Sequence, residues 1–250
     1  MYERFAEVYD ALMDDFDYPK WAEYYVELIR RAGVEPKRMA ECGCGTGSMT
    51  VEFADMGLRV TGMDISPDML RIAGQKARKM GQRIVFAEQD MRQLAVPRSV
   101  DCVVCACDGV NYLTEAEDRD AFFSAAFAAL RPGGVLAFDV STAEKLLEMP
   151  GNVYAEDRDD VSWMWFSESL PDRRVRMDIA FFLRRADGLY ERFDEEQVQR
   201  AHAPEELVSE LKNAGFADIR LYGDRTLEAP RPGEKRMHVT AVRPAADRTK

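Results

Sequence analysis

The sequence predicts an α/β domain whose mainly parallel β-sheet is covered by helices on both faces. Between residues 37 and 140, short apolar runs alternate with amphipathic segments of helical period, which is the pattern of consecutive strand–helix–strand units. The run at 100–107 is almost continuously apolar, as expected for a strand that is buried on both sides. With 250 residues, of which 46% are hydrophobic, the chain can form a filled core, and we expect a single domain over residues 1–250.

Two helices are expected at the N-terminus, in residues 1–33. Apolar side chains recur at helical spacing in residues 5–13 and again in residues 21–29. The segment Asp17-Tyr18-Pro19 separates the two runs, and Gly33 suits the end of the second helix. We expect this pair to form a helical cap on the domain.

Strands and helices alternate in residues 37–150. The strands are expected at 37–42, 58–64, 84–87, 100–107 and 135–140, and the first two helices at 46–56 and 66–80. Ser66-Pro67-Asp68 opens the second of these helices with a capping hydroxyl, a proline and an acid. Thr114 and Glu117 predict a capping box for a third helix, and Pro132-Gly133-Gly134 predicts a turn into the fifth strand.

The pattern changes in residues 151–201, where apolar and polar residues alternate with period two. Asp187-Gly188 is a hairpin signal, so we expect an antiparallel insert of about three strands over residues 153–200. Its charged side chains are expected to face solvent, among them Glu191, Arg192, Asp194, Glu195 and Glu196. Residues 202–250 return to the earlier pattern, with a helix at 204–214 and strands at 217–222 and 237–242.

The composition limits the class of protein. The net charge of −11 argues against a nucleic-acid partner, because phosphate contacts need clustered Lys and Arg. No apolar run approaches the ~20 residues that span a bilayer, and the chain opens without a signal pattern, so we expect a cytoplasmic protein that does not enter a membrane. The five cysteines lie in apolar runs at spacings that fit no zinc template, which predicts neither a disulfide framework nor a metal site.

A glycine-rich turn follows the first strand, in Glu41-Cys42-Gly43-Cys44-Gly45-Thr46-Gly47. Glycines at alternate positions would let the backbone touch a ligand and direct N–H groups toward it. A dinucleotide fingerprint, G-x-G-x-x-G, would need its third glycine at Ser48. Asp64 ends the second strand, where it could bind both hydroxyls of a ribose, and Asp90 follows the third, where it could bind an adenine amino group. Glu41 is a poor neighbour for a pyrophosphate but a good one for a cation.

Together these motifs resemble those of the class I S-adenosylmethionine-dependent methyltransferases. The glycine turn with Glu41 matches their (D/E)-x-G-x-G-x-G motif, Asp64 and Asp90 match the acids after their second and third strands, and Leu130-Arg131-Pro132-Gly133-Gly134 matches a later turn. The segments 5–10 (FAEVYD) and 108–113 (DGVNYL), together with the insert, narrow the resemblance to bacterial small-molecule N-methyltransferases and relatives of unassigned substrate.

The resemblance implies a Rossmann-like sheet of seven strands, with the first and fourth strands adjacent and a reversed edge strand. It also implies S-adenosylmethionine as the cofactor and S-adenosylhomocysteine as the product. The residues that it places around the cofactor are Gly43, Cys44 and Gly45 at the methionine portion, Asp64 and Ile65 at the ribose, Asp90 and Met91 at the adenine, Cys107 beside the sulfonium, and Tyr9 and Trp21 closing over it, with Glu41 and Met69 completing the set.

For the methyl acceptor, the resemblance implies a small molecule methylated at nitrogen or oxygen, with the insert as a lid over a cofactor-binding half at 37–150. The catalytic candidates are Asp108, Asn111 and Tyr112, which follow the fourth strand at the ligand-binding edge of the sheet, and His202 at the end of the insert. A monomer or a homodimer is expected. Two other functions stay open: an NAD-dependent oxidoreductase, and a protein that binds the cofactor for regulation or scaffolding without turnover.

Overall fold

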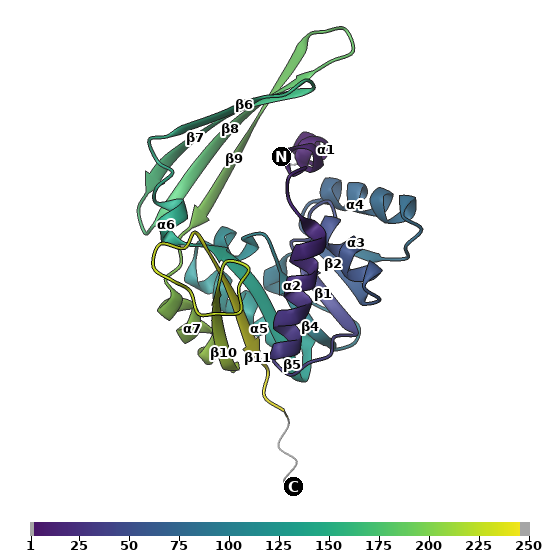
Figure 1. Cartoon of the computed structure of the whole chain (residues 1–250), viewed down its shortest axis with the longest axis vertical. Helices are drawn as coiled ribbons and strands as arrows, with labels where there is room; N and C mark the ends of the chain where they lie inside the picture. The colour runs from purple at the N-terminus through teal and green to yellow at the C-terminus, as the bar shows by residue number, and fades with distance from the viewer. Residues whose placement is uncertain (1–2, 246–250) are drawn as a thin grey trace.

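The computed structural model describes residues 3–245 and contains two β-sheets, one large and one small (Figure 1). The large sheet has seven strands in the order β10-β11-β5-β4-β1-β2-β3. Its strands are β1 (Arg38–Cys42), β2 (Arg59–Asp64), β3 (Val85–Glu88), β4 (Val100–Cys105), β5 (Leu130–Ser141), β10 (Ala217–Gly223) and β11 (Arg236–Val242). Within residues 3–245, no helix is both long enough and apolar enough to span a membrane.

Helices cover both faces of the large sheet. The helices of residues 3–245 are α1 (Glu3–Leu12), α2 (Tyr18–Arg31), α3 (Ser48–Asp55), α4 (Pro67–Lys79), α5 (Ala116–Ala129), α6 (Ala143–Leu146) and α7 (Pro204–Asn213), with the 3₁₀ turns η1 (Met91–Gln93) and η2 (Gly109–Tyr112). Alternate residues of a strand point to opposite faces, so Val103 of β4 packs with α5 and α7, whereas its neighbour Val104 packs with α2 and α3. The expected parallel sheet with helices on both sides is confirmed.

The direction of the strands differs from the prediction at one place. β1 pairs in parallel with β2 and β4, β2 with β3, and β4 with β5. β11 is antiparallel both to β5 and to β10, and its pairing with β5 runs from Arg236 with Ser141 to Val242 with Val135. The reversed strand is therefore second from the edge, and the prediction of a reversed edge strand is wrong. β1 and β4 are neighbours, as the resemblance implied.

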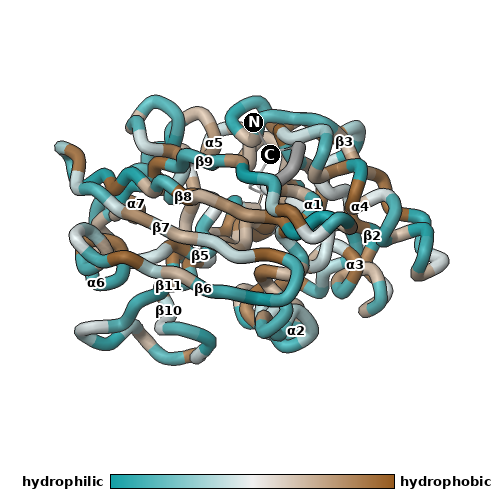
Figure 2. Tube along the Cα trace, turned by 90° about the horizontal axis from the view of Figure 1, so that it is seen from above, coloured by the Kyte–Doolittle hydropathy of each residue, from teal (hydrophilic) through white to brown (hydrophobic). Residues whose placement is uncertain are grey.

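The small sheet is the insert, and it has four antiparallel strands rather than three. They are β6 (Val153–Asp157), β7 (Val161–Leu170), β8 (Arg174–Arg184) and β9 (Tyr190–Arg200), and Figure 2 shows them side by side from above. β6 escaped prediction because its side chains are mostly exposed and carry no apolar alternation. Helix α1 packs between the insert and α4, through Phe5, Met69 and Phe181.

Three local predictions at element ends also need correction. β4 stops at Cys105 rather than at 107, because Cys107 and Asp108 have positive φ angles of 56° and 53°. β5 begins at Leu130, so the Pro-Gly-Gly segment lies inside the strand, where the pairing with β4 shifts register. The capping box at Thr114 is wrong: the first residue before α5 is Glu115, and the Thr114 hydroxyl donates to the Glu115 carboxylate instead.

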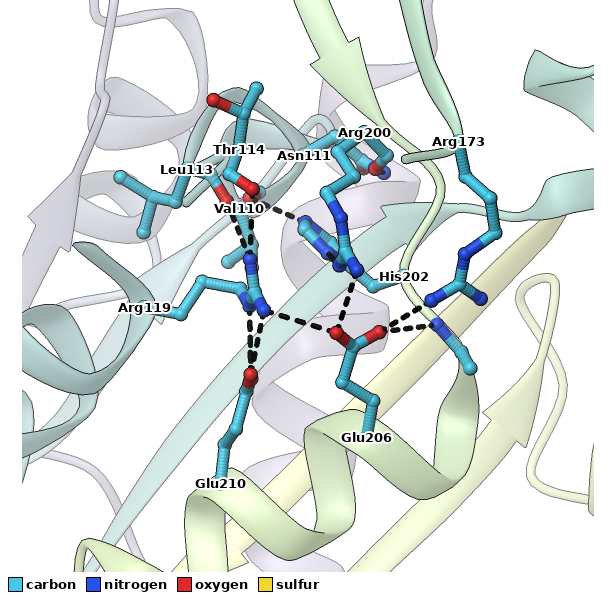
Figure 3. Close-up of polar contacts among 11 residues, drawn as sticks. Val110, Asn111, Leu113, Thr114, Arg119, Arg173, Arg200, His202, Glu206 and Glu210 are labelled. Atoms are coloured by element: carbon cyan, nitrogen blue, oxygen red, sulfur yellow. Dashed lines mark hydrogen bonds and ion pairs between the residues drawn. The ribbon is translucent and has the colours of Figure 1, made fainter. Parts of the chain in front are cut away.

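A buried arginine joins the base of the insert to the sheet (Figure 3). The Arg119 side chain on α5 is 1% exposed and donates to Glu210 at 2.7 Å and to Glu206 at 3.1 Å, both on α7. It also donates to the carbonyls of Leu113 and Thr114. Glu206 accepts in addition from Arg200 at the end of β9, at 2.8 Å. The network therefore fixes α5, α7 and the last residue of the insert relative to one another.

Replacement of this arginine tests the network. Arg119→Ala should lower the free energy of unfolding by about 3 kcal/mol, the lower part of the range for breaking a buried pair, because Glu206 keeps Arg173 and Arg200 as partners. Arg220→Ala removes a surface pair with Asp218 and should change the same quantity by less than about 1 kcal/mol. Urea denaturation measures both variants, and equal losses would contradict the prediction.

Candidate active site

A cavity of about 370 Å³ lies at the carboxyl ends of β1, β2 and β4. In an open α/β sheet this edge binds ligands where the strand order reverses, which here is between β1 and β4. Its wall combines the glycine turn, the ends of β2 and β4, helix α1, turn η2 and strand β9 of the insert. Nine of the residues expected around a cofactor line it: Tyr9, Gly43, Gly45, Asp64, Ile65, Met69, Asp90, Met91 and Cys107.

The glycine turn needs its glycines for two separate reasons. Gly43, Gly45 and Gly47 all have positive φ angles, between 53° and 75°, which side chains disfavour. At Gly47 a Cβ would also lie 2.8 Å from the Cβ of Ala73, so a side chain would push α4 away. The turn therefore keeps its backbone close to the cavity.

Asp64 holds the glycine turn against the end of β2. Its Oδ2 accepts from the Gly45 N–H at 2.8 Å, and its Oδ1 accepts from the Ser66 N–H at 2.9 Å. Burial raises the pKa of Asp64 above its ordinary value, although these backbone bonds oppose the shift. Each carboxylate oxygen keeps a second lone pair, so Asp64 can also accept from the two hydroxyls of a ribose.

Asp90 follows β3, the strand paired with β2, and is bound to an arginine. It precedes η1, accepts from the Arg92 N–H at 2.9 Å and pairs with the Arg92 guanidinium, which also contacts Asp118 at 2.7 Å. The Arg92 pair holds the pKa of Asp90 below its ordinary value, so its carboxylate is ionised at neutral pH. Met91 lies beside Asp90 and faces the glycine turn, since its Cε is 3.6 Å from where a Cβ on Gly43 would lie.

A strained segment forms the wall next to β4. Cys107 and Asp108 both adopt left-handed backbone angles, which non-glycine residues seldom adopt and which the surrounding structure must hold in place. The Asp108 N–H donates to Asp139 at 3.0 Å, and Arg236 donates to the Asp108 carboxylate at 3.2 Å. These bonds fix the backbone at Cys107 where it borders the cavity.

Three other residues expected around the cofactor do not line the cavity. Cys44 is buried beneath the turn, and its N–H donates to the Met63 carbonyl at 2.9 Å. Trp21 is buried in α2, where it packs on His238 and under the guanidinium of Arg236. Glu41 is 2% exposed in β1, and its Oε2 has no hydrogen-bond partner among the described residues.

The carboxyl group of Glu41 nevertheless fits a cationic ligand. Burial raises the pKa of Glu41 to about 8, the nearby Thr50 hydroxyl opposes this shift, and the charge of Asp64 adds to it. A buried carboxyl with an unpaired oxygen costs free energy, and a positive charge placed at the glycine turn would offset that cost. The acid and the turn thus suit a cofactor with a positively charged portion.

Of the catalytic candidates, Tyr112 lines the cavity, and its hydroxyl donates to Gln197 of β9 at 2.8 Å. Asn111 lies behind the wall of the cavity. Its side-chain amide donates hydrogen bonds to the carbonyls of Ser141 and Arg200 and accepts one from the Ser141 N–H. Asp108 lies there too: burial alone would raise its pKa, but Arg236 holds that pKa below the ordinary value. Both residues hold the protein together around the site.

His202 is also away from the cavity. Its Nδ1 accepts from Arg200 at 2.9 Å, and its Nε2–H donates to the Val110 carbonyl at 3.1 Å. Burial and then the nearby Arg119 lower its pKa to about 4, so the imidazole is neutral at pH 7. A buried neutral ring with both nitrogens bonded positions the chain and takes no substrate proton.

The cavity is also lined by residues that the sequence did not predict, which are Phe5, Ser66, Gln89, Arg92, Ala106, Gly109, Leu113, Asp118 and Gln197. Most lie beside a predicted residue, and Phe5 lies one helical turn before Tyr9, so extending each motif by its neighbours would have found them. Gln197 is different, because nothing in the sequence shows which face of β9 turns inward. In the part of the chain described here, all five cysteines are free and no cluster of ligating side chains could hold a metal ion.

Comparison with known proteins decides the family. Residues 39–134 match the family described as "Methyltransferase domain". The Bacillus subtilis (strain 168) protein named "Putative methyltransferase YqeM" is 36% identical over 244 residues, and the match covers 96% of each protein. The chain belongs to the class I S-adenosylmethionine-dependent methyltransferases.

Two solved structures agree with this assignment. An S-adenosylmethionine-dependent methyltransferase from Clostridium acetobutylicum ATCC 824 has a TM-score of 0.87 at 29% identity and covers 98% of this chain and 99% of that one. CalS10, an amino pentose methyltransferase from Micromonospora echinaspora with S-adenosylmethionine bound, has a TM-score of 0.74 at 25% identity and covers 94% of this chain and 96% of that one.

The protein is therefore a methyltransferase that uses S-adenosylmethionine and releases S-adenosylhomocysteine. The alternative of an NAD-dependent oxidoreductase is wrong, and so is that of a binding protein without turnover. The cavity of this methyltransferase also suits the cofactor, because the Asp64 carboxylate lines it and can accept hydrogen bonds from a ribose. The buried acid Glu41 does not line the cavity, but it lies in β1 directly before the glycine turn.

Removal of the Asp64 carboxylate should weaken cofactor binding. We expect Asp64→Ala to raise the Kd for S-adenosylmethionine about 100-fold or more, because two charge-assisted hydrogen bonds are lost and the glycine turn is released. Asp68→Ala, in the first turn of α4 and outside the cavity lining, is the matched control and should change the Kd less than about two-fold. Calorimetric titration measures both, and an unchanged Kd in the Asp64 variant would refute the assignment.

The buried His202 predicts an acid-dependent loss of stability. Its pKa is about 4 in the folded protein and 6.5 when unperturbed, so between these values the unfolded chain binds a proton that the folded one does not. The contribution of His202 to the free energy of unfolding is therefore complete above pH 6.5. As the pH falls toward 4, up to about 3 kcal/mol of it is lost. Urea denaturation at several pH values should show that the free energy of unfolding falls with pH in the wild type and falls less steeply in His202→Gln. Parallel plots of this free energy against pH for the two proteins would contradict the prediction.

Proposed function

We propose that this methyltransferase acts on a small molecule, at nitrogen or oxygen, by in-line displacement. The observation that carries the proposal is the position of the cavity beneath the insert: Tyr112 on one wall donates a hydrogen bond to Gln197 of β9 on the other. A cavity bounded by both sheets suits a metabolite better than a polymer. CalS10 acts on an amino pentose, and the net charge of −11 disfavours RNA.

Methyl transfer by in-line displacement depends mainly on the alignment of the acceptor atom with the methyl group and the sulfur. S-adenosylmethionine supplies a methyl group on a sulfonium, whose departure as a neutral thioether needs no acid. The residues of the wall hold the acceptor atom in line with that methyl group, and correct orientation can supply roughly 7–11 kcal/mol of the barrier. When the acceptor is an amine or a hydroxyl, its proton must also leave, and Tyr112 and Gln197 are polar groups of the wall that can orient the acceptor for this step.

Helix α1 supports this arrangement from above. Phe5 and Tyr9 lie one turn apart, contact each other edge to face at 5.4 Å and line the cavity together. Burial raises the pKa of Tyr9, so the phenol stays neutral at physiological pH. We infer that these two rings exclude water from the transferring methyl group. Whether the protein works as a monomer or a homodimer stays a prediction.

Turnover tests the proposal directly. Purified protein with S-adenosylmethionine should form S-adenosylhomocysteine when supplied with fractionated small metabolites, and mass spectrometry should find a product heavier by one methylene. Formation of the product only with protein or RNA fractions would overturn the proposal, while leaving the family assignment untouched.

A conservative variant locates the acceptor. Tyr112→Phe should lower kcat/KM for the acceptor about ten-fold, because one hydrogen bond to the wall is lost, and should leave the Kd for S-adenosylmethionine within about two-fold. Tyr190→Phe is the control, since Tyr190 is 52% exposed at the start of β9. Steady-state kinetics with the acceptor found above measure both. Loss of cofactor affinity in the Tyr112 variant, with normal kinetics at saturation, would contradict this role.

A further inference from the structure

The underside of the insert carries four polar side chains around an apolar centre. Because side chains alternate along a strand, one face of β7 and one face of β9 turn toward α1 and the cavity, as the cavity-lining Gln197 shows. In the register of the small sheet, Ile179 of β8 lies between Trp165 of β7 and Glu195 of β9, which gives one row across the three strands. Met177 lies between Ser167 and Gln197, which gives the next row. We call the outer members of these two rows the polar corners: Trp165, Ser167, Glu195 and Gln197.

The centre of this surface is buried by two different helices. Ile179 packs with α1 in one apolar cluster, and Met177 packs with α6 in another. Trp165 contacts both clusters, so the polar corners lie where the clusters meet. The corners are about 7 Å apart along a strand and roughly 10 Å apart across β8, which is the size of a small metabolite.

Three of the polar corners each carry a buried polar atom without a partner. The Nε1 of Trp165, the Oγ of Ser167 and the Oε2 of Glu195 have no hydrogen-bond partner among residues 3–245. Buried polar groups are nearly always satisfied, and each exception costs free energy that calls for an explanation. The three exceptions lie on adjacent rows of one face, and the fourth corner of that face, Gln197, lines the cavity. A polar ligand that binds on this face explains them together.

The buried carboxyl group of Glu195 indicates which charge that ligand carries. The sequence predicted that it would face solvent with its neighbours, yet its side chain is 3% exposed on the inner face, whereas Glu196 is exposed on the outer one. No Lys or Arg in the described ranges forms an ion pair with Glu195. Burial raises the pKa of Glu195, and the positive charge of the amino terminus of the chain opposes this shift. A buried carboxyl of this kind gains most from a cation that also donates hydrogen bonds.

We propose that the polar corners bind the methyl acceptor and select a small amine that carries a hydroxyl group, with its ammonium or amine nitrogen at Glu195. This inference rests on the proposed function and narrows it from nitrogen or oxygen to an amine. The carboxylate accepts from the nitrogen, while the Ser167 hydroxyl and the Trp165 N–H can meet an oxygen of the same molecule. The adjoining indole ring adds a face on which a cation can rest.

Simple probes of matched size test the selection without knowledge of the acceptor. The full-length protein is saturated with S-adenosylhomocysteine and titrated calorimetrically with 4-aminobutan-1-ol, 1,4-butanediol and 4-hydroxybutyrate, which are cationic, neutral and anionic. We expect the amine to bind at least about ten-fold more tightly than the diol. In Glu195→Gln this preference should disappear, and in the control Glu196→Gln, on the outer face of the same strand, it should persist.

Four other outcomes of these titrations would each contradict the inference. Equal binding of amine and diol, tighter binding of the anion, binding of none of the probes, or a preference that survives in Glu195→Gln would overturn the inference. Titration with S-adenosylhomocysteine alone shows whether each variant is folded, because its Kd should stay within about two-fold of the wild-type value. If the cofactor product binds while the amine is not preferred, this inference fails and the proposed methyl transfer to another small acceptor stands.

Discussion

A single ion-pair network joins the two sheets to the wall of the cavity, and the rest of the site depends on it. Arg236 of β11 donates to the carboxylates of both Asp108 and Asp139. Asp139 also accepts from the Tyr25 hydroxyl of α2 at 2.5 Å, and Asp108 accepts from Gln199 of β9 at 3.2 Å. Because an unpaired buried charge costs several kcal/mol, the reversed strand, α2, the end of β4 and the insert are held in one arrangement.

This network explains why the wall beside β4 can be strained. The left-handed angles at Cys107 and Asp108 are unfavourable for residues with side chains, and they persist because Asp139 and Arg236 bind the segment from behind. The reversed strand therefore has a second function besides completing the sheet: it brings a cation beneath the two aspartates. A strand at the edge of the sheet would not reach them, which gives the unexpected position of β11 a physical reason.

The sequence predicted the parallel sheet and nine of the residues that line the cavity, because both depend on local signals. Alternating periods mark strands and helices, and the glycine turn, Asp64 and Asp90 each follow a strand whose end can be located. Asn111 and His202 could not be understood in this way. Their partners lie in distant segments of the chain, so burial and bonding, rather than residue type, decide that they hold the wall together.

The acceptor side was harder to predict for a related reason, which is the pairing register of the insert. A shift of β9 by one residue would turn Glu196 inward and Glu195 outward, and nothing in the acidic run 194–196 favours one choice. The register is set instead by the apolar residues of β8, since Ile179 and Phe181 must pack against α1 and their partners in β9 follow. Phe193 then stacks on Phe181 at 4.9 Å, and Glu195 and Gln197 are carried to the inner face beside it. The same packing that attaches the insert to α1 thus determines which polar groups of β9 turn to the inner face.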